Sequence, residues 1–226
     1  SLAMPAVLVA TVTSYSFSAA PNATPHRLAA SNTSQTATTP REGIQGNLCD
    51  TDGSGFFITE NEDVDVITPA GSIACSGTDG TSGHSYGRYH NLADSLPAGP
   101  YELQCVHWGI ETNGTELPVV VNIYRDLDGT PEPNDLQLIT SVDAFIPAGP
   151  YFYFTASFDT TPVDGNDLLF IELVVPAAVD SLFVGGNNLG QSSPSWIKTE
   201  NGECGISSWY TTAQIGYPDV HWVEAV

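Results

Sequence analysis

Basic residues are scarce in this sequence. Lysine and arginine together number five, against 26 aspartates and glutamates, which gives a formal net charge of −21 over 226 residues. The charged fraction is only 14%, well below the usual quarter, so the net charge arises from missing cations rather than from extra anions. Nucleic acids and anionic membrane surfaces are disfavoured as partners, because both require clustered Lys and Arg. Metal cations or a cationic partner are the natural counter-charge.

The sequence also lacks an apolar run of 18 residues, so it predicts no membrane span. The 21 glycines and 16 prolines are spaced so closely that no helix-length stretch shows a 3.6-residue period of apolar residues. The start has neither an initiator methionine nor a basic stretch. We interpret it as a mature or trimmed terminus, with a leftover piece of signal peptide as the alternative.

Cysteine is limited to four residues, with no C-x-x-C pair and no zinc-like spacing from a histidine. An even number in a chain rich in Ser and Thr favours two disulfides and an oxidising compartment, against the alternative of four buried free thiols. Three pairings are possible, and we favour Cys49–Cys75 with Cys105–Cys204. The sequence therefore predicts a secreted protein or one on an extracellular surface.

The chain does contain many short apolar runs separated by turn residues. In residues 118–142, two runs rich in β-branched residues flank an acidic loop broken by Gly and Pro, which is typical of a β-hairpin. The sequence LPAGPY at 96–101 returns as IPAGPY at 146–151, and Pro followed by Gly marks a turn between strands. We expect strands near 64–67, 85–90, 101–110, 118–125, 136–143, 151–158, 168–175, 181–185, 194–198, 205–210, 213–217 and 220–225. This pattern indicates an all-β domain over residues 44–226, a jelly-roll-like antiparallel sandwich of two sheets.

Residues 1–43 have a different character. Residues 6–17 alternate, which predicts an extended N-terminal strand with Val7, Val9, Tyr15 and Phe17 on one face and serines on the other, apolar on both sides near Leu8–Val12. Residues 19–43 are polar and predict a linker that spans about 80 Å when extended, against about 40 Å for the domain. The strand therefore either pairs within its own sheet or reaches a neighbouring molecule.

Five segments of the second half form a further pattern: SYGRYHNLAD (85–94), PVVVNIY (118–124), FVGGNNLGQSSPSWI (183–197), Cys204-Gly205-Ile206 and IGYPDVHWV (215–223). Together they resemble an uncharacterised β-sandwich module that recurs in large secreted bacterial proteins. The resemblance covers about residues 85–226 and implies an extracellular β-sandwich without assigned catalytic residues. Residues 1–84 lie outside it.

Acidic loops are the candidate cation sites, because calcium binds several converging carboxylate and carbonyl oxygens. The residues 50–55 begin like an EF-hand loop, but Asn61 stands where the bidentate Glu belongs. At each loop the alternative is a solvated acidic turn. The predicted calcium ligands are Asp126, Asp128, Asn134 and Asp135 in the hairpin loop and Asp50, Asp52 and Ser54 in the first loop, with Asp164, Asn166 and Asp167 as a weaker third group.

Other motifs favour packing over chemistry. Residues 83–87 match G-x-S-x-G around Ser85, but neither the buried strand before it nor the helix after it is predicted, so we expect no hydrolase and no enzyme. A sugar-stacking platform is a minor alternative to core packing for Trp196, Trp209, Tyr210 and Tyr217. Glycosylation candidates are the three N-x-S/T sequons at Asn22, Asn32 and Asn113.

These observations lead to a functional hypothesis. We expect a non-enzymatic extracellular subunit that assembles with copies of itself, in a filament if the contact propagates, by donating residues 6–17 to a sheet edge of its neighbour. Calcium and disulfides would stabilise the subunit. The alternative is a carbohydrate-binding or adhesin module that takes glycans as partners.

Overall fold

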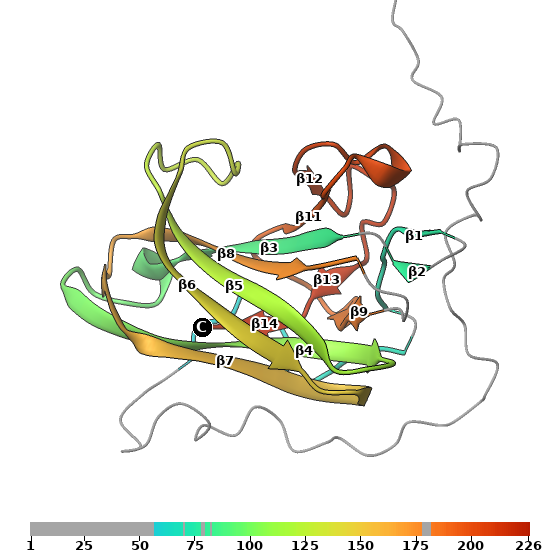
Figure 1. Cartoon of the computed structure of the whole chain (residues 1–226). Helices are drawn as coiled ribbons and strands as arrows, with labels where there is room; N and C mark the ends of the chain where they lie inside the picture. Colours follow the sequence, from blue (N-terminus) through green and yellow to red (C-terminus); the bar gives the residue numbers. More distant parts are fainter. Residues whose placement is uncertain (1–56, 70, 78–79, 82, 178–181) are drawn as a thin grey trace, which may run out of the picture.

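Six long strands form the body of the molecule in the computed structural model (Figure 1), which describes residues 57–226 except 70, 78–79, 82 and 178–181. They are β3 (His84–Asn91), β4 (Pro100–Asn113), β5 (Leu117–Asp126), β6 (Leu136–Ile146), β7 (Gly149–Asp164) and β8 (Leu168–Val175). The shorter strands are β1 (Ser76–Gly77), β2 (Gly80–Thr81), β9 (Phe183–Val184), β10 (Gly186–Asn187), β11 (Ser195–Thr199), β12 (Tyr210–Thr211), β13 (His221–Trp222) and β14 (Glu224–Ala225). Two 3-10 turns, Leu92–Asp94 and Glu203–Gly205, complete the elements.

The strands form two main antiparallel sheets that pack face to face. One sheet has six strands in the order β12-β11-β3-β8-β5-β6, and the other has the order β14-β4-β7, with β9 also pairing with β4. The predicted all-β antiparallel sandwich is therefore confirmed.

The pairing of the long strands is nested around the loop 127–135. Strand β5 pairs with β6, β4 with β7, and β3 with β8, as if one long hairpin had been rolled up. The pairing of β5 with β8 closes the roll. Rolling a long hairpin in this way is the jelly-roll arrangement, and it separates β4 and β7 from the other four long strands, as Figure 1 shows.

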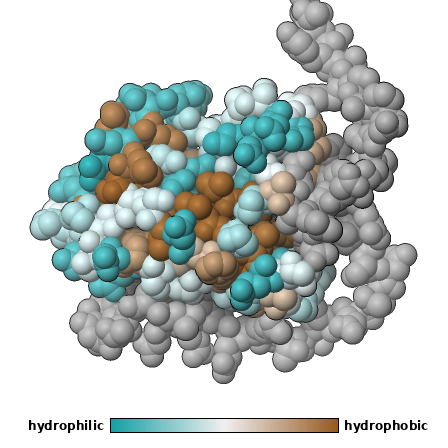
Figure 2. Space-filling model, in the orientation of Figure 1, coloured by the Kyte–Doolittle hydropathy of each residue, from teal (hydrophilic) through white to brown (hydrophobic). Residues whose placement is uncertain are grey.

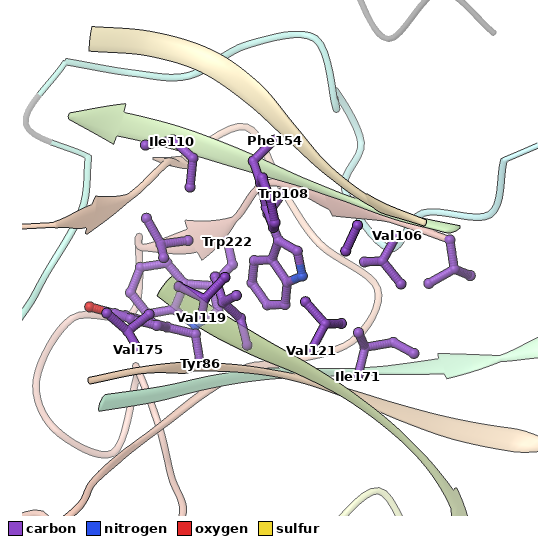
Figure 3. Packing of buried hydrophobic residues seen from close by; sticks show 14 of the residues in the cluster. Tyr86, Val106, Trp108, Ile110, Val119, Val121, Phe154, Ile171, Val175 and Trp222 are labelled. Carbon is purple, nitrogen blue, oxygen red and sulfur yellow. The ribbon is translucent and has the colours of Figure 1, made fainter. Parts of the chain in front are cut away.

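The core lies between the two sheets because inward and outward side chains alternate along each strand. On β5, for example, Val119, Val121 and Ile123 are buried in the same hydrophobic cluster. Trp108 and Trp222 are fully buried and lie among the aliphatic side chains of both sheets (Figure 3). Each fully buried side chain of this size contributes about 1.5–3 kcal/mol through the apolar surface that it removes from water.

A charged side chain is also buried inside the sandwich. Arg88 of β3 is fully buried, and its guanidinium donates hydrogen bonds to five oxygens from separate segments of the chain. The acceptors are the backbone carbonyls of Glu60 (3.1 Å), Ser193 (3.0 Å) and Trp222 and the side-chain oxygens of Asn61 (3.0 Å) and Gln191 (3.0 Å). Three of the segments that carry the resemblance, 85–94, 183–197 and 215–223, therefore meet at one guanidinium.

The charges of two glutamates balance Arg88. Burial lowers the pKa of Arg88 to about 10, although the charges of Glu224 and Glu60 act to raise it, so the guanidinium remains positive at neutral pH. Glu224 also contacts His90, with 2.8 Å between its Oε2 and the ring Nε2. The residues around 58–62 and the C-terminal strand β14 are thus held together by a buried polar cluster.

The disulfide pairing corrects the sequence-based preference. Cys75 is bonded to Cys204, with 6.0 Å between their Cα atoms, so neither Cys49–Cys75 nor Cys105–Cys204 is right. The reason is strand order: β3 and β11 are neighbours, which brings the segment before β3 next to the segment after β11. Cys105 is disulfide-bonded as well, and Cys49 lies outside the described residues.

In the described part of the chain, two predicted strands, 64–67 and 213–217, are absent, and of 205–210 only Tyr210 lies in a strand. Residues 64–65 form a turn, the segment 205–210 begins within a 3-10 turn, and 213–217 is a series of turns. Gly205 and Gly216 have φ values of 77° and 94°, which strand backbone does not adopt. The extended N-terminal strand, the linker and the predicted boundary at residue 43 lie outside the described residues.

The buried position of Arg88 yields a stability prediction. We expect Arg88→Met to lower the free energy of unfolding by about 3–5 kcal/mol, because two buried carboxylates and several carbonyls lose their partner. Urea unfolding followed by tryptophan fluorescence measures the change.

Arg125→Met is the matched control, because Arg125 pairs with Asp167 at 2.8 Å in a partly exposed position. There we expect a loss of no more than about 1 kcal/mol. Equal midpoints for the Arg88 and Arg125 variants would contradict the role of the buried guanidinium.

Candidate functional site on the outer face of the six-stranded sheet

The outer face of the six-stranded sheet carries the side chains that alternate with the core. On β8, Leu169, Ile171 and Leu173 are buried toward the core, so Phe170, Glu172 and Val174 stand on the opposite face. Strand β5 aligns its own outward residues with them, Tyr124 beside Phe170, Asn122 beside Glu172 and Val120 beside Val174. The face is thus divided into an aromatic row, a polar row and an apolar row.

The aromatic row is filled and covered. Phe170 packs between Tyr89, at 4.8 Å between ring centroids, and Trp209, at 5.0 Å. Gly87 makes room for this ring, because a Cβ atom at that position would lie 2.2 Å from Phe170 Cζ. The segment that carries Trp209 therefore closes one end of the outer face.

Glu172 occupies the centre of the polar row. Its side chain is 4% exposed and accepts hydrogen bonds from Asn122 Nδ2 (3.0 Å), Tyr124 Oη (2.8 Å) and Lys198 Nζ (3.2 Å). Burial raises the pKa of Glu172, but the hydrogen bonds from Asn122 and Ser85 and the charge of Lys198 outweigh burial and hold the pKa below 4.5. The carboxylate is therefore ionised at neutral pH.

The polar row fixes the position of Lys198, the single lysine of the chain. Its ammonium binds Glu172 and lies 4.5 Å from the centroid of the Trp209 ring. Such cation–π contacts add to the electrostatic attraction of the carboxylate. An ammonium has three N–H donors, so Lys198 keeps donors for a ligand while its position is set by two protein groups.

Beyond the polar row the outer face is hollowed into an open groove of about 1030 Å³. Val120 and Val174 lie in the groove, and Phe145 of β6 lines it with 62% of its surface exposed. Figure 2 shows hydrophobic surface near the middle of the face in view. Further lining residues are Pro118, Asn122, Asp143, Pro176, Lys198, Glu200 and Ser207. Apolar surface with a few fixed polar groups is typical of a small-molecule site.

The predicted calcium ligands in the hairpin loop take part in local hydrogen bonds. Asp126 is buried, and its carboxylate accepts from Tyr89 Oη (2.8 Å) and from the N–H groups of Asp128 (3.1 Å) and Gly129 (2.8 Å). The Asn134 side chain donates to Glu132, and the Asp135 carbonyl accepts from Leu127 N–H. As far as residues 57–226 are described, they contain no group of three His, Cys, Asp or Glu side chains placed to hold a metal ion. Calcium binding stays a prediction.

The other acidic groups lie apart from the groove or outside the description. In the third loop, Asp167 forms an ion pair with Arg125, and Asp164 accepts from the Asn166 side chain at 2.8 Å. The first loop, with Asp50, Asp52 and Ser54, lies outside the described residues.

The aromatic residues predicted as a sugar platform divide between two clusters. Trp196 and Trp209 belong to the covered row of the outer face, whereas Tyr210 and Tyr217 pack against the main core. The exposed aromatic ring in the groove is Phe145 instead. The four residues therefore pack in hydrophobic clusters, as the preferred prediction had it, and do not form a single platform.

The positions of Asn113 and Ser85 in the fold bear on two further sequence motifs, the glycosylation sequon and the G-x-S-x-G match. Asn113 is 4% exposed and its Nδ2 donates to the carbonyls of Ile146 (3.1 Å) and Pro147 (3.2 Å), so the folded protein does not present it for glycosylation. Ser85 lies within β3, so the strand–turn–helix of a nucleophile elbow is not formed around it. Asn22, Asn32 and the apolar face of residues 6–17 lie outside the described residues.

Sequence reasoning missed Glu172, Lys198 and Phe145. One signal was present: Glu172 is the single charged residue in the apolar strand LLFIELVV. A carboxylate in such a strand is buried only with partners.

The comparisons with known proteins add no assignment. No family model, no curated protein and no solved structure matches this chain. The described part contains no helix that is long and apolar enough to cross a membrane.

The polar row yields a prediction of pH dependence. Because the pKa of Glu172 is lower in the folded state than its ordinary value of 4.5, the carboxylate stabilises the fold above that pH, and this contribution is lost as the pH falls through the folded pKa. We expect the difference in unfolding free energy between wild type and Glu172→Gln to shrink as the pH falls below 4.5.

Urea unfolding at a series of pH values measures the effect. Glu116→Gln, at an exposed position outside the groove, serves as the control. A wild-type advantage over Glu172→Gln that stays constant with pH would contradict the stabilising role of the ionised carboxylate.

Proposed function

We propose that the protein is a non-enzymatic extracellular module that binds an uncharged glycan in the groove of the outer face. The observation that carries the proposal is the pairing of a fixed ammonium, Lys198, with an exposed aromatic ring, Phe145, in one open groove. The module thus corresponds to the carbohydrate-binding alternative derived from the sequence, with different residues.

The chemistry of a sugar ring matches this combination. A pyranose has an apolar face of C–H groups, which stacks on an aromatic ring, and hydroxyl groups around its edge, which require hydrogen-bond partners. Phe145, Val120 and Val174 supply the apolar surface. Lys198 supplies donors, and the carboxylates of Asp143 and Glu200 supply acceptors.

The charge of the groove supports an uncharged ligand. Its lining includes three acidic residues, Asp143, Glu172 and Glu200, and one basic residue, Lys198, so the formal charge is −3 + 1 = −2. Glycans that carry carboxylate or sulfate groups would meet like charge, which disfavours their binding.

A glycan array with the labelled protein tests this function, followed by calorimetry with the best neutral oligosaccharide. We expect Phe145→Ala and Lys198→Met each to weaken binding at least tenfold, about 1.4 kcal/mol, because each removes one of the two kinds of contact. The loss with Lys198→Met separates a directed hydrogen bond from nonspecific adhesion to apolar surface.

Leu138→Ala is the matched control, since Leu138 lies on the same strand with 53% exposure but does not line the groove. Thermal unfolding of all variants confirms that they are folded. Binding that survives both groove substitutions, or an array with no neutral glycan bound, would remove the proposal.

Self-assembly through residues 6–17 and stabilisation by calcium also stand as proposals. The acidic excess of the chain supports cation binding, and the alternating pattern of residues 6–17 supports strand donation. We expect light scattering after size exclusion to show polymers for the full-length chain and monomers for a chain without residues 1–18. We also expect a chelator to lower the melting temperature of the full-length protein. A chelator that changes neither mass nor melting temperature would rule out structural calcium.

A further inference from the structure

Strand β6 forms an open border of the six-stranded sheet. One of its edges pairs with β5 along nearly its whole length, from the pair Asp126–Leu136 to the pair Leu117–Ile146. Its other edge has no strand partner within the described residues. Figure 1 shows β6 at one side of the sandwich, where the chain passes from β6 into β7 of the other sheet. The N–H and C=O groups along such an edge are a template for another strand.

The edge of β6 lacks the usual protection against pairing. Natural edge strands are short or carry Lys or Pro, which prevent the approach of another chain. Strand β6 is 11 residues long, LQLITSVDAFI, and contains no Lys, Arg or Pro and a single charge, Asp143. The strand at the opposite border, β12, has only two residues.

The hydrophobic interior reaches the surface along β6. Its residues Ile139, Val142 and Ala144 pack against the core but are only partly buried, whereas the core residues of the neighbouring β5 are buried. In a sandwich the outermost strand leaves its core-facing side chains half covered unless a further strand or loop lies beside it. One more strand with an apolar face would complete this side of the core.

We propose that β6 is the acceptor edge for residues 6–17 of a second copy of the chain. This inference rests on the proposed self-assembly and assigns its acceptor. Residues 6–17 carry Val7, Val9, Tyr15 and Phe17 on one face, and the opposite face is apolar around Leu8–Val12 and polar at Ser14 and Ser16. At the border of a sandwich the first face would cover the core, and the polar part of the second face would meet solvent.

Two lengths fit the proposal: that of the donor segment, residues 6–17, and that of the chain between this segment and the described domain. Twelve residues, 6–17, match the 11 residues of β6. Residues 18–56 join the donor to the described domain, and an extended chain of that length reaches about 130 Å, about three times the diameter of the domain. A second copy is therefore within reach of the donor.

Complementation between two full-length variants tests the assignment. Val9→Lys places a charge on the apolar face of the donor, and Val142→Lys places one on the core-facing side of the acceptor edge. We expect the wild type to assemble, each variant alone to be monomeric by light scattering, and an equimolar mixture to form a 1:1 dimer. The mixture has one intact acceptor, on the Val9→Lys chain, and one intact donor, on the Val142→Lys chain.

Leu127→Lys is the matched control, because it charges an exposed leucine in the loop before β6 and should leave assembly unchanged. A monomeric wild type would overturn both self-assembly and the acceptor. Assembly that is lost with Val9→Lys but kept with Val142→Lys would overturn the acceptor alone.

Hydrogen exchange keeps the assignment testable if Val142→Lys fails to fold. In the full-length Val9→Lys chain the sandwich sequence is unchanged, and we expect the amides of β6 that point away from β5 to exchange at least tenfold faster than in wild type. Equal exchange in the two proteins would overturn pairing at β6.

Discussion

The buried guanidinium of Arg88 is the constraint on which the rest of the sandwich depends. It donates to oxygens of residues 60, 61, 191, 193 and 222, which belong to three segments far apart in the sequence. A buried charge requires compensating partners, and here the two terminal nitrogens of the guanidinium donate to five oxygens. The position of Arg88 therefore fixes how the start of the described domain, the long loop after β10 and the C-terminal strands pack together.

The rolled hairpin then places the groove. With the C-terminal strands held, β11 pairs with β3 and brings Lys198 beside Ser85, while β5 and β8 bring Asn122 beside Glu172. Glu172 and Lys198 are 26 residues apart in the chain but 3.2 Å apart in space. The same roll leaves β6 at the border, so the outer groove and the open edge share one strand.

Most of the long strands could be predicted, because alternation is a local property. The pair of runs around residues 127–135 predicted β5 and β6, and the run LLFIELVV predicted β8. The segments 205–210 and 213–217 have strand-like composition, but glycines with positive φ and short-range hydrogen bonds make them turns. The choice between core packing and a sugar platform could not be made residue by residue, because composition gives the aromatic residues but not the face on which each one lies.

The sequence by itself determined the class of fold, the acidic character and the alternation of side chains along most of the long strands. These follow from the period-two geometry of β-strands and from composition, and both can be read within a few residues. Only the tertiary structure decided which strands are neighbours, and with that the pairing of Cys75 with Cys204, the partners of Arg88, and the meeting of Glu172, Lys198 and Phe145. Neighbour order is set by the burial of the whole core, a sum over distant residues that no local pattern contains.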